Sequence, residues 1–380
     1  MEHADSPTLQ TASATAPPPR DRLLSLDVYR GLIMFLLVGE GAAFYNALQS
    51  LDTPWLRPIV AQFHHVEWRG LVLWDLIQPG FMFIVGVAMA FSLTKRAAQG
   101  QSWNRQFRHI LLRCAILFAL GTGLHCIYAD ALVFELWNVL TQLSFTILLA
   151  FLIFRWPSWM QGLVAIGLIL ATDLAYRFVH VAPYDGTFEP GNNFGTWIDT
   201  VLMGKTSGGH WVAINAVPTA AHTIAGCVAG KWLRSEASPG RKVAGLLGVG
   251  VALIVLGYAM DTLGVAPIVK RICTSSFVIV SAGWCVAALG VFYLACDVWK
   301  WRRGWGVFVV VGMNPILIYM VTEMLAWGWL NPNVGIFVGG SLEALGITAR
   351  LAAVATAGVT WALLWGLCLW LYQRRIFIRI

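Results

Sequence analysis

The chain has 380 residues, of which 58% are hydrophobic and only 12% are charged, and its mean hydropathy is +0.68. This composition excludes a soluble globular protein of this size and predicts an integral membrane protein. Because about 20 apolar residues cross a bilayer, the chain can supply about ten spans and leaves no room for a second soluble domain. We therefore expect an all-α, polytopic protein with a single transmembrane domain over residues 21–380.

The chain opens on a polar, proline-rich stretch, residues 1–20, which lacks an apolar signal-peptide core. It predicts a disordered cytoplasmic tail followed by an uncleaved first span. The ten apolar runs long enough to cross lie at about 31–49, 70–94, 109–128, 136–154, 157–176, 211–230, 243–264, 276–296, 305–328 and 351–373. The stretch 334–348 is short and glycine-rich, which favours an interfacial or re-entrant segment.

The formal net charge of +7 has a topological explanation. Of the 26 lysines and arginines, 19 fall on the same side as the N-terminus and seven on the other side. Cytoplasmic loops carry such an excess, so both termini are predicted to be cytoplasmic and no nucleic-acid partner is needed. The seven cysteines show no metal-ligand spacing, and no metal site is expected.

Charged residues inside spans are costly and are therefore functional candidates. Glu40 lies ten residues after Arg30, about 15 Å along a helix, which places it near the middle of the membrane. Asp75 lies in the second span, and Pro79 is expected to kink that helix. Together they predict a polar pocket between the first two spans. The alternative for both carboxylates is a structural hydrogen bond between helices.

A second cluster stands where the far-side loop enters the second span. If residues 64–70 are helical, His65 and Trp68 share a face. A neutral imidazole there suits a general base or a nucleophile, since its ordinary pKa is near 6.5. The alternative is an interfacial belt of histidine, tryptophan and arginine.

Several motifs together resemble the bacterial relatives of heparan-alpha-glucosaminide N-acetyltransferase, from about residue 22 to the end. The matching runs are Ser25-Leu-Asp27-Val-Tyr29-Arg30-Gly31, His65-Val-Glu-Trp68-Arg-Gly70, Trp74-Asp75-Leu-Ile-Gln-Pro79, Phe83-Ile-Val-Gly86, Asn138-Val-Leu-Thr-Gln142, Thr274-Ser275-Ser276-Phe277 and Gly312-Met313-Asn314-Pro315 with Tyr319.

The resemblance implies a transmembrane acetyltransferase that takes acetyl-CoA from the cytoplasm and acetylates a terminal amino sugar on the opposite side. It also implies a bacterial inner-membrane location, homodimerisation, and a role for His65 as the essential histidine. The sequence departs from the family late in the first span, where Glu40 and Gly41 stand in place of an asparagine. We take His65, Glu40 and Asp75 as the candidate catalytic residues.

Donor and acceptor contacts follow from the chemistry of the reaction. The phosphates of coenzyme A need a basic cytoplasmic rim, for which Arg22, Arg30, Lys95 and Arg96 are candidates, although positive-inside residues need no ligand. The acceptor and the tetrahedral oxyanion need donors and aromatic faces. The candidates are Trp68, Ser275, Ser276 and Asn314, with Gln142 and His222 as weaker ones, Trp197 and Trp211 as covers of a sugar site, and Lys270 with Arg271 as the one close basic pair on that side.

Three alternatives stay open from the sequence. O-acylation of an envelope glycan uses the same chemistry on a hydroxyl acceptor. A proton-coupled carrier would use Glu40 and Asp75 as coupling carboxylates and His65 as a gate. A non-catalytic relative would keep the fold without the reaction.

Overall fold

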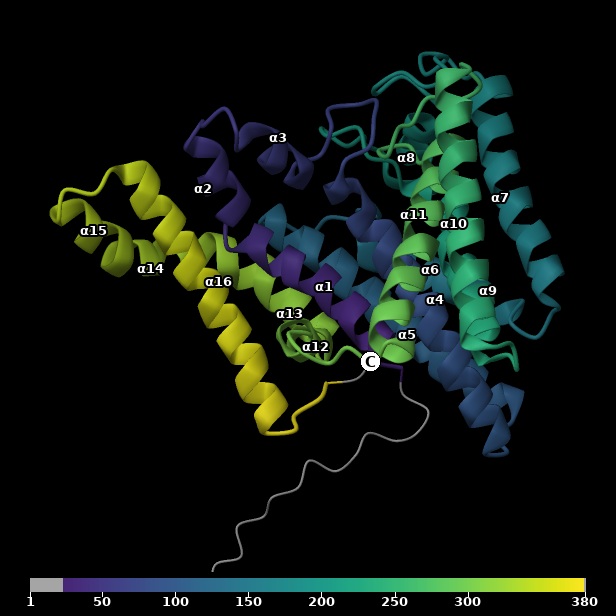
Figure 1. Ribbon diagram of the computed structural model, residues 1–380. Helices are drawn as coiled ribbons and strands as arrows, with labels where there is room; N and C mark the ends of the chain where they lie inside the picture. Colours follow the sequence, from purple (N-terminus) through teal and green to yellow (C-terminus); the bar gives the residue numbers. More distant parts are fainter. Residues whose placement is uncertain (1–22, 379–380) are drawn as a thin grey trace, which may run out of the picture.

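The computed structural model describes residues 23–378, and over that range it is built of helices, with no strand beyond two isolated bridges (Figure 1). The predicted all-α class is confirmed. The elements are α1 Leu24–Gly41, α2 Phe44–Ser50, α3 Arg57–Val60, η1 Ala61–Phe63, η2 Leu73–Leu76, α4 Ile77–Ala98, α5 Trp103–Tyr128, α6 Val139–Leu152, α7 Ser158–Phe178, α8 Phe194–Met203, η3 Ala213–Asn215, α9 Ala216–Arg234, α10 Pro239–Thr262, α11 Ser275–Tyr293, η4 Leu294–Val298, α12 Gly306–Gly312, α13 Pro315–Val321, η5 Thr322–Leu330, α14 Asn331–Val334, η6 Gly335–Gly339, α15 Gly340–Ala344 and α16 Ala349–Gln373.

Within residues 23–378, six helices are long and apolar enough to cross a membrane, and two bent helix pairs raise the number to as many as eight. The six are η2 with α4, α5, α7, α10, α11 with η4, and α16. The bent pairs are α1 with α2, at 57°, and α12 with the run from α13 to α15, at 81°. The ten predicted spans are therefore not confirmed.

The two predicted spans without such a helix became α6, with 14 residues, and α9, with 19. Both pack against α4 and against each other in the interior. A helix enclosed by other helices need not be uniformly apolar, and α9 buries Thr219, His222 and Thr223. The length of α6 and the polar residues of α9 thus leave these two predicted spans unconfirmed.

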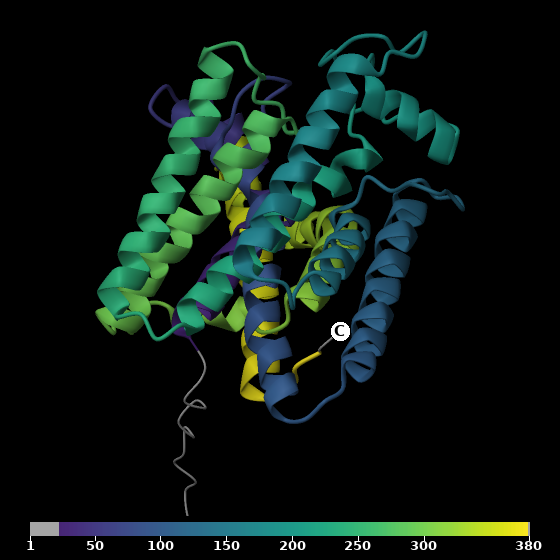
Figure 2. The same cartoon turned by 90° about the vertical axis from the view of Figure 1, so that its right-hand side faces the viewer.

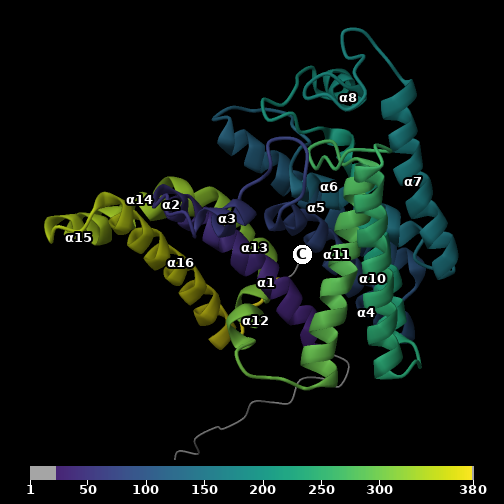
Figure 3. The same cartoon turned by 45° about the horizontal axis from the view of Figure 1, so that its top comes forward.

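Each bend has a local backbone cause. Ala43 adopts a left-handed φ of 62° between α1 and α2. Pro315 is the first residue of α13, and it lacks the N–H that would continue the backbone hydrogen bonds of α12. After this break the chain stays helical to Ala344, so residues 334–344 continue the helical run that begins at Pro315, and their predicted interfacial or re-entrant placement stays a prediction. Figure 3 shows α14, α15 and α16 projecting from the rest of the bundle.

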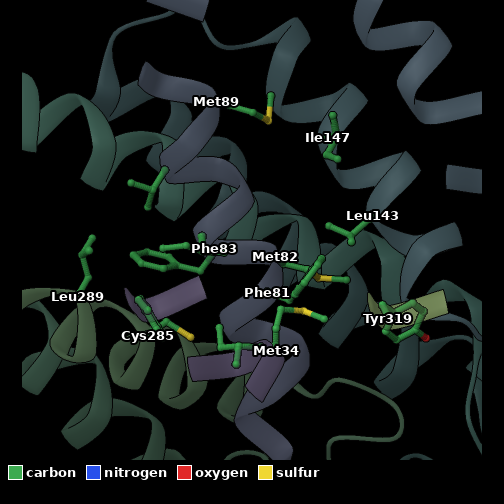
Figure 4. Packing of buried hydrophobic residues seen from close by; sticks show 14 of the residues in the cluster. Met34, Phe81, Met82, Phe83, Met89, Leu143, Ile147, Cys285, Leu289 and Tyr319 are labelled. Atoms are coloured by element: carbon green, nitrogen blue, oxygen red, sulfur yellow. The ribbon is translucent and has the colours of Figure 1, made fainter. Parts of the chain in front are cut away.

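The core surrounds α4. Met82 and Phe83 of α4 are fully buried against Met34 of α1 and neighbouring side chains (Figure 4). The backbones of α4 and α9 are in close contact, because a Cβ on Gly226 would lie 2.0 Å from the carbonyl oxygen of Phe83. The two green helices at the edge of Figure 2, α10 and α11, pack side by side in the same glycine-assisted way.

The two ends of the described chain lie at the same end of the bundle (Figure 1). The backbone N–H groups of Leu24 and Ser25 donate to the carboxylate of Asp297, at 3.0 and 3.1 Å. Asn314 similarly holds the segment after α16. Two termini at one end agree with an even number of crossings. That this end faces the cytoplasm stays a prediction. The predicted disordered tail, residues 1–20, lies outside the described residues.

Gly226→Ala is expected to destabilise the protein by about 1–3 kcal/mol, because the added methyl group meets backbone and cannot be relieved by a side-chain rotation. The matched control is Gly167→Ala in α7, where a Cβ meets nothing within 4 Å and helix propensity improves. Thermal unfolding in detergent compares the two. Equal melting temperatures would contradict the packing described for α4 and α9.

Candidate active site

A cavity of about 350 Å³ opens among the helix ends opposite the chain termini. The segments that meet there are the ends of α1 and α5, the starts of α4 and α6, the α13–η5 helix, and loops that follow α8 and α10. Its polar lining consists of Glu40, His65, Gln78, His125, Tyr128, Asn138, Ser207, Lys270, Tyr319 and Glu323. The predicted polar pocket between the first two spans is thus larger, and five further segments contribute to it.

His65 and Asp75 form a hydrogen-bonded pair on one wall of this cavity. Nδ1 of His65 lies 2.7 Å from Oδ1 of Asp75, and the aspartate side chain is 0% exposed while the histidine side chain is 33% exposed. A carboxylate only accepts, so Nδ1 carries the proton and Nε2 keeps its lone pair for the cavity. The other Asp75 oxygen accepts from the backbone N–H of Val72, at 3.1 Å, which fixes the carboxylate.

Residues 64–70 are not helical, so the condition under which His65 and Trp68 would share a helix face is not met. Gly70 has a φ of 124°, which a side chain would disfavour, and its N–H donates to the carbonyl of Ile268. Pro79 falls in the first turn of α4, where a missing N–H costs little, and η2 with α4 remains one helical run. The predicted kink at Pro79 is therefore absent.

Lys270 adds a buried positive charge beside the pair. Its Nζ lies 3.3 Å from Nδ1 of His65 and 3.7 Å from Oδ1 of Asp75. Burial lowers the pKa of Lys270 to about 8 even though Asp75 and Glu40 oppose the shift. The pKa of His65 is also lowered, first by burial and further by Lys270, and the hydrogen bond and charge of Asp75 only partly offset this. His65 is accordingly neutral at neutral pH.

Trp211 forms an aromatic wall next to His65. The two rings meet edge to face with centroids 5.5 Å apart, and the cations of Lys270 and Arg271 lie 5.6 and 5.5 Å from the Trp211 ring. Trp197, the other tryptophan predicted for this side, packs against Phe194 and does not line the cavity. Trp211, and not Trp68, thus lies beside His65.

The cavity lining also contains acidic side chains. Glu40 from α1 and Glu323 from η5 both line the cavity and are close enough for their charges to interact. The hydroxyl of Tyr128 donates to Glu323 at 2.5 Å. Glu40 was expected here, whereas Glu323 was missed because it lies in a segment predicted only as an apolar span.

A second histidine in the lining was also missed. Nδ1 of His125 lies 2.5 Å from Glu135, whose other oxygen accepts from Lys205 at 2.7 Å. The available signal was a histidine at the far-side end of an otherwise apolar run, followed ten residues later by a glutamate.

The four predicted substrate-binding residues are not brought together, and none of these described side chains lines the cavity. Trp68 donates to the carbonyl of Phe188 at 2.9 Å and anchors the loop before α8. Ser275 donates to Asp173 at 2.8 Å. Ser276 donates to the carbonyl of Pro267 at 2.7 Å, shaping the loop that presents Lys270. Asn314 binds backbone groups of Ile376 and Ile378.

The weaker candidates likewise have partners inside the bundle. The amide of Gln142 accepts from Gln78, which does line the cavity. His222 is fully buried in α9 and its Nε2 lies 2.8 Å from the hydroxyl of Ser281. Among the described residues, no group of three or more His, Cys, Asp or Glu side chains is arranged to hold a metal ion.

The predicted donor-binding arginines gather at the other end of α1 and α4. Arg30 donates to the carbonyl of Gly312 at 2.7 Å and pairs with Asp27 at 2.9 Å. Arg96 lies 2.9 Å from His109 of α5, and the charges of both interact with Arg113. Arg113, which the sequence did not single out, is close enough to interact with Arg30 too, and its buried Nε has no hydrogen-bond partner.

Two further residues were predicted to bind the phosphates of the donor. Lys95 is exposed in the last turn of α4, next to Arg96. Arg22 lies outside the described residues.

Comparison with known proteins gives a partial match. The chain is 32% identical to heparan-alpha-glucosaminide N-acetyltransferase from Homo sapiens over 111 residues, which are 28% of this chain and 14% of the human protein. It is 30% identical to the Mus musculus protein of the same name over 105 residues, 27% of this chain and 13% of the mouse protein. No family model matches the chain. The similarity is therefore distant and covers a small part of these curated relatives.

Opposite shifts in the His65 pKa are expected from two variants. Asp75→Asn removes a partner that raises this pKa and should lower it further, whereas Lys270→Met removes a charge that lowers it and should raise it. Nuclear magnetic resonance titration of ¹³C-labelled histidine, with His65→Gln to assign the signal, measures both. The His180 signal serves as the internal control, and shifts of the same sign in both variants would contradict the geometry.

Proposed function

We propose that the protein is a membrane acetyltransferase that moves an acetyl group from cytoplasmic acetyl-CoA to the amine of an amino sugar on the opposite side. The observation that carries the proposal is the His65 and Asp75 pair at the cavity wall. The partial similarity to heparan-alpha-glucosaminide N-acetyltransferase supports the same reaction class.

The chemistry needs the lone pair that Asp75 keeps on Nε2 of His65. Acting as a base, Nε2 takes a proton from the acceptor nitrogen as that nitrogen attacks the thioester carbonyl. The C–S bond then breaks, and the proton passes to the sulfur, giving an amide and the free thiol. Acting as a nucleophile, the same Nε2 attacks the thioester carbonyl and the C–S bond breaks to release the thiolate. The amine then attacks the acetyl carbon, the bond to Nε2 breaks, and the proton of the amine ends on the sulfur.

Charges around His65 suit the intermediate. Lys270, with its pKa of about 8, stays mostly protonated at neutral pH and places a positive charge at the cavity wall. The side-chain amides of Gln78 and Asn138 also line the cavity and are able to donate to a developing oxyanion. Both effects stabilise negative charge on the thioester oxygen.

The acidic side chains favour an amine as the acceptor. A protonated amine is a cation, and the acidic side chains of Glu40 and Glu323 in the cavity lining attract it. A neutral hydroxyl has no comparable electrostatic attraction to these side chains. We therefore favour N-acylation over O-acylation. The faces of Trp137 and Trp211 suit a sugar ring.

The basic cluster of Arg30, Arg96 and Arg113 supports entry of the donor from the chain-terminus side. Coenzyme A phosphates cannot enter hydrocarbon and require such a cluster near the membrane surface. Arg30 lies ten residues, about 15 Å of helix, from Glu40, so the pantetheine arm would bridge the cluster and the cavity alongside α1.

Purified protein in liposomes is expected to transfer radiolabelled acetyl from acetyl-CoA to glucosamine, and His65→Ala should reduce kcat/KM by about 10²–10⁴-fold. His180→Ala, at an exposed loop histidine, is the matched control and should keep full activity. Incubation with labelled acetyl-CoA in the absence of acceptor distinguishes the two routes. Label that stays on the protein supports the acetyl-histidine intermediate, and unlabelled protein supports direct transfer.

A proton-coupled carrier is the second candidate, favoured by the paired carboxylates of Glu40 and Glu323 in the interior. Sugar uptake into the liposomes without acetyl-CoA consumption would establish the carrier and reject the enzyme. Binding of acetyl-CoA without transfer to any amine would indicate a non-catalytic relative. The inner-membrane location and homodimerisation remain predictions.

Arg113→Met and Arg96→Met are expected to raise KM for acetyl-CoA about tenfold, because each removes a charge-assisted phosphate contact worth roughly 1.5–3 kcal/mol. The KM for glucosamine should stay the same. Arg241→Met, at an exposed position on the same side, is the control for general surface charge. Unchanged KM for acetyl-CoA in both variants would remove this cluster from the donor site.

A further inference from the structure

The cavity contains a second histidine backed by a carboxylate, which the chemistry above does not use. His125 lies in the last turn of α5, and its Nδ1 lies 2.5 Å from Oε2 of Glu135. Oε1 of Glu135 accepts from Nζ of Lys205 at 2.7 Å. The last turn of α5, the loop that follows it and the loop after α8 thus meet to hold one imidazole.

The arrangement fixes the His125 tautomer as Asp75 fixes that of His65. Burial alone would raise the pKa of Glu135, but hydrogen bonds and charges from Lys205 and His125 hold it below its ordinary value. Glu135 is therefore an ionised acceptor at neutral pH and requires a proton on Nδ1 of His125. Nε2 of His125 is left to the cavity, and among the described residues it has no hydrogen bond.

His125 stands at the acidic end of the cavity. Its ring centroid lies 5.7 Å from that of Tyr128, whose hydroxyl donates to Glu323. Trp137 lies beside it, with ring centroids 6.3 Å apart, and is fixed by a 2.7 Å hydrogen bond to Asp199. A cationic amine attracted by Glu323 therefore arrives next to His125.

An acceptor that arrives as an ammonium ion must lose two protons to become an amide. The first leaves before attack, because an ammonium nitrogen has no lone pair. The second leaves after the nitrogen has bonded to the carbonyl carbon. A single neutral imidazole holds one proton at a time, so a site with two carboxylate-backed imidazoles matches this requirement.

We propose that His125, held by Glu135 and Lys205, is a catalytic base that takes the first proton from the acceptor ammonium group, while His65 handles the second. This inference rests on the acetyltransferase function proposed above. The first proton passes from the acceptor nitrogen to Nε2 of His125 and is then released to water. The second passes through His65 to the sulfur as the C–S bond breaks, so that the overall products are the amide, the free thiol and one proton.

The test compares two acceptors in the full-length protein in liposomes. Glucosamine is largely protonated near neutral pH, whereas hydroxylamine is already uncharged and needs no first deprotonation. His125→Gln should lower kcat/KM for glucosamine by about 10²-fold and change transfer to hydroxylamine little, after subtraction of the uncatalysed rate. The loss with glucosamine should diminish as the pH is raised and the amine loses its proton unaided.

Glu135→Gln provides a second variant that keeps the size of the side chain, and it should show the same acceptor selectivity with a smaller loss. His180→Gln, at an exposed histidine of the loop before α8, is the control and should match the wild type with both acceptors. Melting temperatures and acetyl-CoA affinity verify that each variant is folded and binds the donor.

Equal losses with both acceptors, or full activity of His125→Gln with glucosamine, would overturn the assignment of His125 while leaving the acetyltransferase function in place. Absence of transfer by the wild-type protein to either acceptor would overturn the proposed function, and the role of His125 with it. The wild-type measurement therefore separates the two failures.

Discussion

A carboxylate with no exposed surface must be compensated, and the compensation of Asp75 organises the candidate site. Its two oxygens are engaged by Nδ1 of His65 and the N–H of Val72, with Lys270 nearby at 3.7 Å. Burying such a charge without partners costs several kcal/mol, so the loop before α4 and the loop before α11 are held where they satisfy it. The same contacts leave one imidazole nitrogen for chemistry, which links the stability of the site to its proposed reaction.

The helices serve as a frame for this pair. Glycine contacts bring α4 and α9 together at backbone distance, and the apolar core around Met82 fixes the direction in which α4 begins. The breaks after Gly41 and before Pro315 have the opposite effect, because they turn helical segments aside and leave room between them. Glu40 and Glu323 reach the cavity from the two bent helix pairs. The same helices thus form a close-packed interior along one part of their length and line a polar cavity along the next.

Charge is distributed unevenly over the cavity. Lys270 and Arg271 flank Trp211 beside His65, whereas Glu40 and Glu323 bring acidic groups to the same cavity lining. An ordered field of this kind favours a substrate pair in which one partner develops negative charge and the other carries positive charge. A thioester and an ammonium ion form such a pair. In the proposed reaction, the arginine cluster on the chain-terminus side receives the phosphates of the donor, so the two reactants have distinct sites.

The amino-acid sequence by itself determined the membrane character, the all-α class and the motifs around His65 and Asp75. These are properties of composition and of short segments, and burial in lipid or protein imposes them locally. The number of spans was less accessible, since α6 is short and α9 buries polar side chains. Only the tertiary structure decided which polar side chains share the cavity. Trp68, Ser275, Ser276 and Asn314 proved to hold loops and chain ends, whereas Lys270, His125 and Glu323 converge from distant segments. Where a side chain points depends on the packing of every helix around it, and a linear pattern of residue types does not contain that information.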